Sequence, residues 1–274
     1  MKIHTVFSLA AYLCVAGCFT EDNPVASKEK GFTLPESGVL LDDFEDVAGS
    51  ADQITLTEMH KRQGGEVPQP PAGVWSVYHD DEYSHVLAPS GERIIDYLAI
   101  REGHASNFGL TVGDWGHSGR GVHMVWVLEG SNYPYVGFGT SFLGTFDEDW
   151  YDFSSLTAVS FWAKGSGRVR TCLTTDTIQN GYAEGQNWGH FSSDFTLQPQ
   201  WTYYEFAAED FVTKPYSPAQ KDGLVWEDGM DKVCYFEIQN SQYYDRYADD
   251  TLEIYVDDIH LHGLTYEVFG LNKP

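Results

Sequence analysis

The sequence is poor in basic residues. Sixteen lysines and arginines stand against 41 aspartates and glutamates, which gives a formal net charge of −25. A surface of this sign repels phosphate backbones and anionic lipid headgroups. The shortage of positive charge therefore argues against nucleic acid, anionic membrane surfaces and polyanionic glycans as partners. Neutral ligands and cations remain.

Long apolar runs are also lacking, apart from one near the start. Val6 to Ala16 is apolar and follows Lys2, which is the layout of a signal peptide too short to span a membrane permanently. It ends in Val15-Ala16-Gly17-Cys18, a pattern typical of a bacterial lipobox in which Cys18 is acylated and becomes the first residue. We expect residues 1–18 to be a lipoprotein signal peptide; the alternative is an ordinary signal peptide that contains a cysteine.

The residues after Cys18 have no apolar period. Residues 19–37 are rich in Glu, Lys, Asn, Pro and Ser, so they are predicted to form a flexible tether. Phe19 stands where aspartate would signal retention in the inner membrane, which favours the outer membrane or the cell surface. Residues 38–274 are long enough for a single large β domain.

Cysteine is scarce. Of four cysteines, Cys14 lies in the signal peptide and Cys18 is the lipidation site, so only Cys172 and Cys234 could form an internal disulfide. Export permits a disulfide, but two buried thiols that act as small apolar residues are an equal alternative. The sequence leaves both open.

Helical repeats longer than two turns are missing. Apolar and polar residues alternate with period two between glycine-rich turns, and Pro218 to Asp222 is the one expected helical turn. The predicted strands are Val39–Glu45, Gly73–His79, Val122–Leu128, Tyr135–Phe142, Leu156–Lys164, Arg168–Thr174, Phe195–Leu197, Trp201–Phe206, Val233–Gln239 and Leu252–Leu261. The pattern predicts an all-β fold, an antiparallel β-sandwich of jelly-roll type. Gly103–Arg120 and Thr175–Trp188 are the expected functional loops.

An ordered set of short motifs runs through residues 38 to 263. They are Leu41-Asp42-Asp43-Phe44-Glu45, Trp75 with Tyr78, Ser118-Gly119-Arg120-Gly121-Val122, Asp152-Phe153-Ser154-Ser155-Leu156, Val159-Ser160-Phe161-Trp162-Ala163-Lys164, Trp201-Thr202-Tyr203-Tyr204-Glu205-Phe206 with Phe211, and Tyr255-Val256-Asp257-Asp258-Ile259-His260-Leu261. In this order the chain resembles family 11 carbohydrate-binding modules and their galactose-binding-like jelly-roll relatives. The resemblance implies a sandwich that binds β-glucan chains on one sheet, with aromatic rings under the sugars and calcium as a structural ion.

The resemblance also implies binding residues. Tyr78 matches a tyrosine that stacks on sugar, although Trp75 and Tyr78 could both be core aromatics. The other positions that match binding positions of the family are Tyr133, Tyr135, Asp176, Asn180, Trp188, Lys214 and Tyr216. The loop that holds Asp176, Asn180 and Trp188 differs in length from the family pattern, and Pro215 replaces an acidic residue beside Lys214.

In the predicted strand Val233–Gln239, the alternation of residues indicates binding residues independently of the family resemblance. Cys234, Phe236 and Ile238 share one face, so Tyr235, Glu237 and Gln239 share the other. One aromatic ring, one carboxylate and one amide suit a sugar, which has an apolar ring face and hydroxyl groups at its edge. A merely solvated outer face is the alternative.

Three carboxylates are candidates for calcium. Asp43 and Glu45 are two residues apart and so point to the same side of the first strand. The resemblance places Asp257, on the closing strand, beside them, and three such oxygen ligands would suit Ca²⁺.

Motifs of catalysis are not found. The sequence contains no Gly-x-Ser-x-Gly elbow, no His-Glu-x-x-His and no phosphate-binding loop, and the ten histidines are scattered. We therefore expect a lipid-anchored envelope protein that binds a β-glucan or another plant polysaccharide and is not an enzyme. The alternatives are a glycoside hydrolase or lyase on the same sandwich and an envelope protein–protein interaction module.

Overall fold

The computed structural model describes residues 38–45, 53–66, 68, 72–79, 84–89, 110–129, 134–241 and 250–272. The predicted signal peptide, Cys18, the tether and Tyr133 lie outside these residues. Within the described part of the chain, no helix has the length and apolar character needed to cross a membrane.

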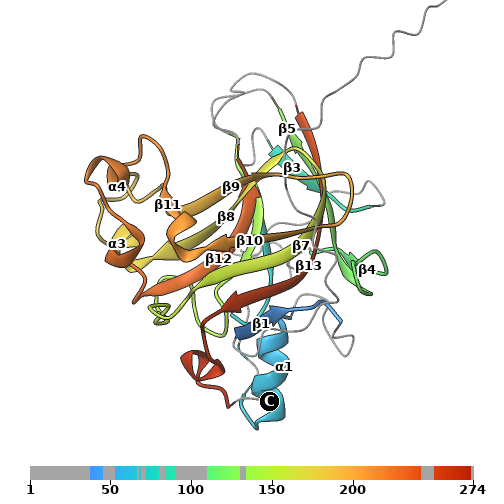
Figure 1. Cartoon of the computed structure of the whole chain (residues 1–274), viewed down its shortest axis with the longest axis horizontal. Coiled ribbons are helices and arrows are strands. Elements are labelled where there is room, and N and C mark those ends of the chain that lie inside the picture. The colour runs from blue at the N-terminus through green and yellow to red at the C-terminus, as the bar shows by residue number, and fades with distance from the viewer. Residues whose placement is uncertain are drawn as a thin grey trace, which may run out of the picture. The chain divides into compact units, whose positions relative to one another are not determined.

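The described strands form two antiparallel sheets (Figure 1). The seven-stranded sheet has the order β10 (Thr202–Ala207), β7 (Ala158–Ser166), β13 (Asp250–His262), β5 (Gly121–Leu128) and β3 (Ser84–Leu87), with β1 (Gly38–Asp42) paired to β13 and β4 (Val112–Gly113) paired to β5. The six-stranded sheet has the order β11 (Val212–Thr213), β9 (Phe191–Thr196), β8 (Arg168–Thr175), β12 (Val233–Asn240), β6 (Val136–Thr140) and β2 (Ser76–His79).

The two sheets pack against each other through aromatic side chains. Trp126 of β5 lies 6.4 Å, ring to ring, from Phe138 of β6. Phe161 of β7 lies 5.5 Å from Phe195 of β9. These four side chains belong to one buried apolar cluster, to which both sheets contribute alternate residues. The predicted antiparallel β-sandwich is confirmed.

The ten predicted strands all overlap strands of the structure, but β3, β4 and β11 were not predicted. These three are short, and short strands give little period-two signal. Helix α1 (Thr55–Arg62) was also missed, because Leu56 and Met59 make only a two-turn apolar pattern before they pack into the core. The predicted turn at Pro218 is α4 (Pro218–Lys221); α3 (Asp176–Gln179) lies in one of the expected loops.

Strand β13 is shared by three neighbours. It pairs with β7 on one side, whereas β5 pairs with its first half, from Asp250 to Val256, and β1 pairs with Ile259 to His262. The register with β7 shifts between Asp257 and His260, and Asp258 has a left-handed φ of 51°. This irregularity bends β13 at the point where β1 replaces β5 as its neighbour.

Both remaining cysteines are free, buried thiols. Their strands, β8 and β12, are neighbours, but the register sets Cys172 opposite Glu237 rather than opposite Cys234. The disulfide alternative is therefore wrong for this structure, and the alternative of two buried thiols holds.

Asp42 is a buried carboxyl at the end of β1, with 1% of its surface exposed. The indole N–H of Trp75 donates to Oδ2 at 2.5 Å, and the Phe44 N–H and the Thr55 hydroxyl donate to Oδ1. Burial outweighs these hydrogen bonds and raises the pKa of Asp42 to about 7. Trp75 thus links β1 to the core around Phe138 and Phe236.

Candidate functional site

The outer face of the six-stranded sheet carries two rows of polar residues that cross the strands. In one row the register aligns Ser76, Gly139, Glu237, Cys172 and Ser192. In the other it aligns Tyr78, Gly137, Gln239, Arg170 and Asp194. Because side chains alternate along a strand, these residues lie on the side opposite the core residues Phe236 and Ile238.

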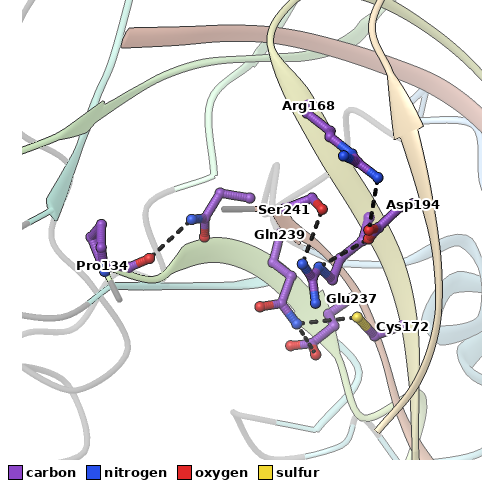
Figure 2. A network of polar contacts seen from close by, with 9 residues as sticks. Pro134, Arg168, Cys172, Asp194, Glu237, Gln239 and Ser241 are labelled. Atoms are coloured by element: carbon purple, nitrogen blue, oxygen red, sulfur yellow. Dashed lines mark hydrogen bonds and ion pairs between the residues drawn. The ribbon is translucent and has the colours of Figure 1, made fainter. Parts of the chain in front are cut away.

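At the centre of this face, four side chains are joined by hydrogen bonds. The Tyr78 hydroxyl donates to Glu237 Oε2 at 2.5 Å. The Gln239 amide nitrogen lies 2.8 Å from Glu237 Oε1 and 3.1 Å from the sulfur of Cys172. Figure 2 shows the Gln239 amide between Glu237 and Cys172. The side chains therefore hold one another in fixed positions before any ligand arrives.

Two glycines of β6 make room for the aromatic rings. A Cβ atom at Gly137 would lie 2.5 Å from the Tyr78 hydroxyl oxygen. One at Gly139 would lie 2.4 Å from Cε1 of Tyr235. Real Cβ contacts are not that short, so Tyr78 and Tyr235 can lie across β6 only because these two residues have no side chain.

Beyond Cys172, the face continues as an ion-pair network. Nε of Arg170 is 3.3 Å from Oδ1 of Asp194, and the guanidinium also donates to the Ser241 hydroxyl at 3.0 Å. Arg168 reaches the second oxygen of Asp194 at 3.3 Å. Figure 2 shows Arg168 beside Asp194, with Ser241 on the side of Gln239. Asp194 is thus held by two cations.

Burial governs the protonation of this face. It raises the pKa of Glu237, while the hydrogen bond from Tyr78 and the charge of Lys214 act in the opposite direction. Burial also raises the pKa of the Tyr78 hydroxyl well above its usual value, and the charge of Glu237 raises it further. Burial and the like charge of Arg170 lower the pKa of Lys214. Tyr78 therefore stays protonated and donates to Glu237.

The flanking tyrosines border this cluster. The Tyr235 hydroxyl is hydrogen-bonded to that of Ser76 at 2.8 Å, and its ring contacts Phe146 edge to face. Tyr135 is 45% exposed, and its ring centroid is 6.4 Å from that of Tyr78. The prediction that Tyr235, Glu237 and Gln239 share a face is confirmed. Tyr78 joins them there, whereas Trp75 alone is the core aromatic.

Three predicted residues lie toward the β9–β11 end of the same sheet. Gly189, the residue after Trp188, packs against the side chains of Lys214 and Ser217. Trp188 is 41% and Tyr216 71% exposed. Tyr216 has a left-handed φ of 66°, and its backbone N–H donates to Gln220 at 2.7 Å. Both rings are thus exposed at this end of the sheet.

Asp176 and Asn180 do not join this cluster. The Asn180 amide donates to Asp176 at 2.9 Å and to Asp147 at 3.1 Å. Lys232 forms an ion pair with Asp176 at 2.9 Å. These contacts stabilise the loop around α3, and ligand contact by the two residues stays a prediction of the sequence.

Arg170, Cys172, Asp194 and Ser76 were missed as site residues. The alternation in Arg168–Thr174 does place Arg170 and Cys172 on the outer face, which was the available signal. It could not be used without the register, because only the pairing of β8 with β12 shows that Cys172 faces Glu237.

The carboxylates predicted to bind calcium each have separate partners. Asp257 Oδ2 accepts the N–H groups of His117 and Ser118 at 2.7 and 3.1 Å. Glu45 accepts the N–H of Arg120 at 2.6 Å, and Asp43 that of Glu45. Across the described ranges, no three His, Cys, Asp or Glu side chains are placed to hold a metal ion. The arrangement by itself does not form a calcium site, so calcium stays a prediction of the sequence.

No family model and no curated protein sequence matches the chain. Among solved structures, it is similar to the family 11 carbohydrate-binding module of a cellulosomal cellulase of Clostridium thermocellum, with 18% identity, a TM-score of 0.48 and coverage of 83% of this chain and 95% of that one. A structure of a Clostridium thermocellum module of the same family, in complex with a β-1,3-1,4-mixed-linked tetrasaccharide, matches at 19% identity and a TM-score of 0.47, with 83% and 96% of the two chains covered. A family 29 carbohydrate-binding module matches at 10% identity and a TM-score of 0.29, over 61% of this chain and 84% of that one.

Proposed function

We propose that the domain binds a neutral polysaccharide, such as a β-glucan, on the outer face of the six-stranded sheet and does not cleave it. The observation that carries the proposal is the cluster of Tyr78, Glu237 and Gln239 beside Gly137 and Gly139. It offers a phenol, a carboxylate and an amide in fixed positions, and sugar hydroxyls need both donors and acceptors.

Exposed rings at both ends of this face complete the argument. Tyr135 lies next to Tyr78, and the exposed Trp188 precedes Gly189, which packs against Lys214 at the other end. The C–H face of a pyranose packs on such rings, so a chain that crosses the strands would contact aromatic side chains at its ends and polar groups between them. The overall charge of −25 favours a neutral chain over an acidic one.

Hydrolysis would need a second carboxylate that can act on the scissile bond together with Glu237. Asp194 is the other carboxylate in the two rows, and Arg168 and Arg170 occupy both of its oxygens. This pairing opposes a role as nucleophile or base. These contacts therefore support binding of the polysaccharide without hydrolysis.

The binding test is calorimetric titration of the purified protein with soluble β-glucan, glucomannan and xylan. We expect one class to bind with a Kd of about 1 to 100 μM, which is ordinary for a shallow polar site, and no reducing ends to be released during long incubation. Release of reducing ends would favour the hydrolase alternative. Failure of the folded protein to bind any of the three polymers would contradict the proposal.

We also propose that the domain is anchored to the cell envelope through acylated Cys18, as the pattern Val15-Ala16-Gly17-Cys18 indicates. Two or more acyl chains give stable membrane attachment, whereas one gives only marginal binding. Replacing Cys18 with serine should therefore shift the protein from the membrane fraction to the soluble fraction, and a detergent-phase partition of both forms measures this. Equal partition of the two forms would show that the anchor is absent.

A further inference from the structure

The outer face of the other, seven-stranded sheet also carries aromatic side chains, and the proposed function does not use them. They come from β10 and the residue before it, from β7, β13 and β5, and from the loop after β4. We call this set the aromatic platform; its members are Trp115, His117, His123, Trp162, Trp201, Tyr203 and Tyr255.

The platform is continuous. Tyr203 and Trp162 are 5.5 Å apart, ring to ring, and His117 is stacked on Trp162 at 3.7 Å. Trp201 lies 5.8 Å from His117 and 6.3 Å from Tyr255. Beyond Tyr255, His123 is stacked at 3.9 Å and is followed by Trp115 at 5.6 Å. The rings therefore extend across four neighbouring strands.

Polar atoms are interleaved with the rings. The ammonium of Lys164 lies over both Trp201 and Tyr255, at 5.0 and 4.4 Å from the ring centroids. Glu253 Oε1 is 2.9 Å from the Tyr255 hydroxyl and 2.9 Å from His123. Glu205 accepts a hydrogen bond from Tyr203 at 3.0 Å. Each tyrosine of the platform thus has a carboxylate at its edge.

This composition discriminates between kinds of partner. The core of a protein–protein interface is depleted of charged residues, whereas Lys164 and Glu253 stand within the platform. An acidic ligand is disfavoured by Glu205, Glu253 and the net charge of −25. Ring faces beside carboxylate acceptors match the apolar face and the hydroxyl edge of a neutral sugar. Tyr203, 36% exposed, and the exposed His117 are open to such a ligand.

We infer that the aromatic platform is a second carbohydrate-binding surface, which takes a neutral glycan chain independently of the site around Tyr78 and Glu237. The two sites lie on the outer faces of two sheets that pack against each other. One molecule of protein would therefore hold two separate polysaccharide chains and cross-link them.

The test measures binding and cross-linking separately. Static light scattering is recorded while the protein is added to soluble β-glucan, glucomannan and xylan, and affinity electrophoresis in the same polymers reports binding. Three forms are compared: the unaltered protein, a first-site variant with Tyr78→Ala and Glu237→Ala, and a platform variant with Trp201→Ala and Tyr203→Ala. The single variant Tyr203→Ala, at an exposed position, is included because it leaves the other rings in place.

We expect the unaltered protein to raise the light scattering of one polymer. Each double variant should still bind that polymer, but its increase in scattering should be smaller by at least about fivefold. The Tyr203→Ala protein should retain its fold and show a partial loss. Unchanged scattering for both platform variants would overturn the inference while leaving the first site intact. The inference would also be overturned if the platform variant still binds the polymer and the first-site variant does not. In that case the polymer is bound at the first site alone.

The reverse result is also informative. If the first-site variant binds as well as the unaltered protein and the platform variant does not bind, the proposed function fails at its site and the platform inference stands. The molar mass of the protein alone, measured by light scattering, is the control for self-association. A dimer that dissociates in the platform variant would overturn the inference, because the platform would then bind a second copy of the chain.

Discussion

Replacing Tyr78 with alanine is expected to weaken binding of the preferred polysaccharide to the six-stranded sheet by at least about 30-fold, or about 2 kcal/mol, the range of a residue that dominates an interface. Two effects combine. The ring that lies across Gly137 is lost, and Glu237 loses the donor that fixes its carboxylate. The measurement is calorimetry with a soluble oligosaccharide short enough to occupy one site.

Tyr78→Phe separates these two effects. It keeps the ring and removes only the hydroxyl, so we expect a loss of about threefold to tenfold, the worth of one ordinary hydrogen bond. Tyr182→Ala is the matched control, since its hydroxyl also donates to a carboxylate, that of Asp222 at 2.9 Å, outside the two polar rows. Equal affinities for the Tyr78→Ala and unaltered proteins would show that the sugar does not contact this face.

Trp75→Phe is expected to lower the free energy of unfolding by about 3 kcal/mol at pH 8, from a lost hydrogen bond to a buried carboxylate and a partly unfilled ring site. The loss should become smaller as the pH is lowered. The pKa of Asp42 is raised to about 7 in the folded protein, so this group stabilises the fold least when it is ionised, above that pH. Its contribution to stability rises as the pH falls from about 7 toward the unfolded value.

Without the indole donor, the pKa of Asp42 in the folded state rises further, because the hydrogen bond from Trp75 favours the ionised form. The penalty of the variant therefore applies above pH 7 and declines once the carboxyl is protonated in the folded state. Urea unfolding at several pH values between about 5 and 8 measures this dependence.

Trp126→Phe is the matched control. Trp126 is fully buried, but its indole nitrogen has no hydrogen-bond partner among the described residues. The same change of ring should therefore cost less and show no dependence on pH in this range. A pH-independent loss in Trp75→Phe would contradict the role assigned to the hydrogen bond with Asp42.

The sequence was sufficient to predict the sandwich because period two is a local property. Phe236 and Ile238 alternate with Glu237, and this alternation alone assigns the faces of β12. What lies opposite Glu237 could not be predicted in the same way. The neighbours Gly139 and Cys172 come from strands far apart in the chain, and only the register between the strands brings them to Glu237.

The aromatic platform was missed for a related reason. Trp162 and Tyr203 stand in motifs that indicate the fold, and neither motif indicates that the two rings meet across β7 and β10. The calcium prediction also depended on spacing within one strand, and it stays a prediction. Asp43 and Glu45 were grouped by their spacing, whereas backbone N–H groups of the 117–120 loop satisfy the carboxylates of Glu45 and Asp257.

The pairing of β1 with the second half of β13 also decides how the domain responds to mechanical force. Gly38 opposes His262, and Leu40 opposes His260. A pull on the chain ahead of Gly38 reaches β1 first and passes through this ladder into β13, which β5 and β7 hold on its two sides. Such a pull would therefore load a central strand of the seven-stranded sheet, whereas Tyr78 and Glu237 belong to the other sheet.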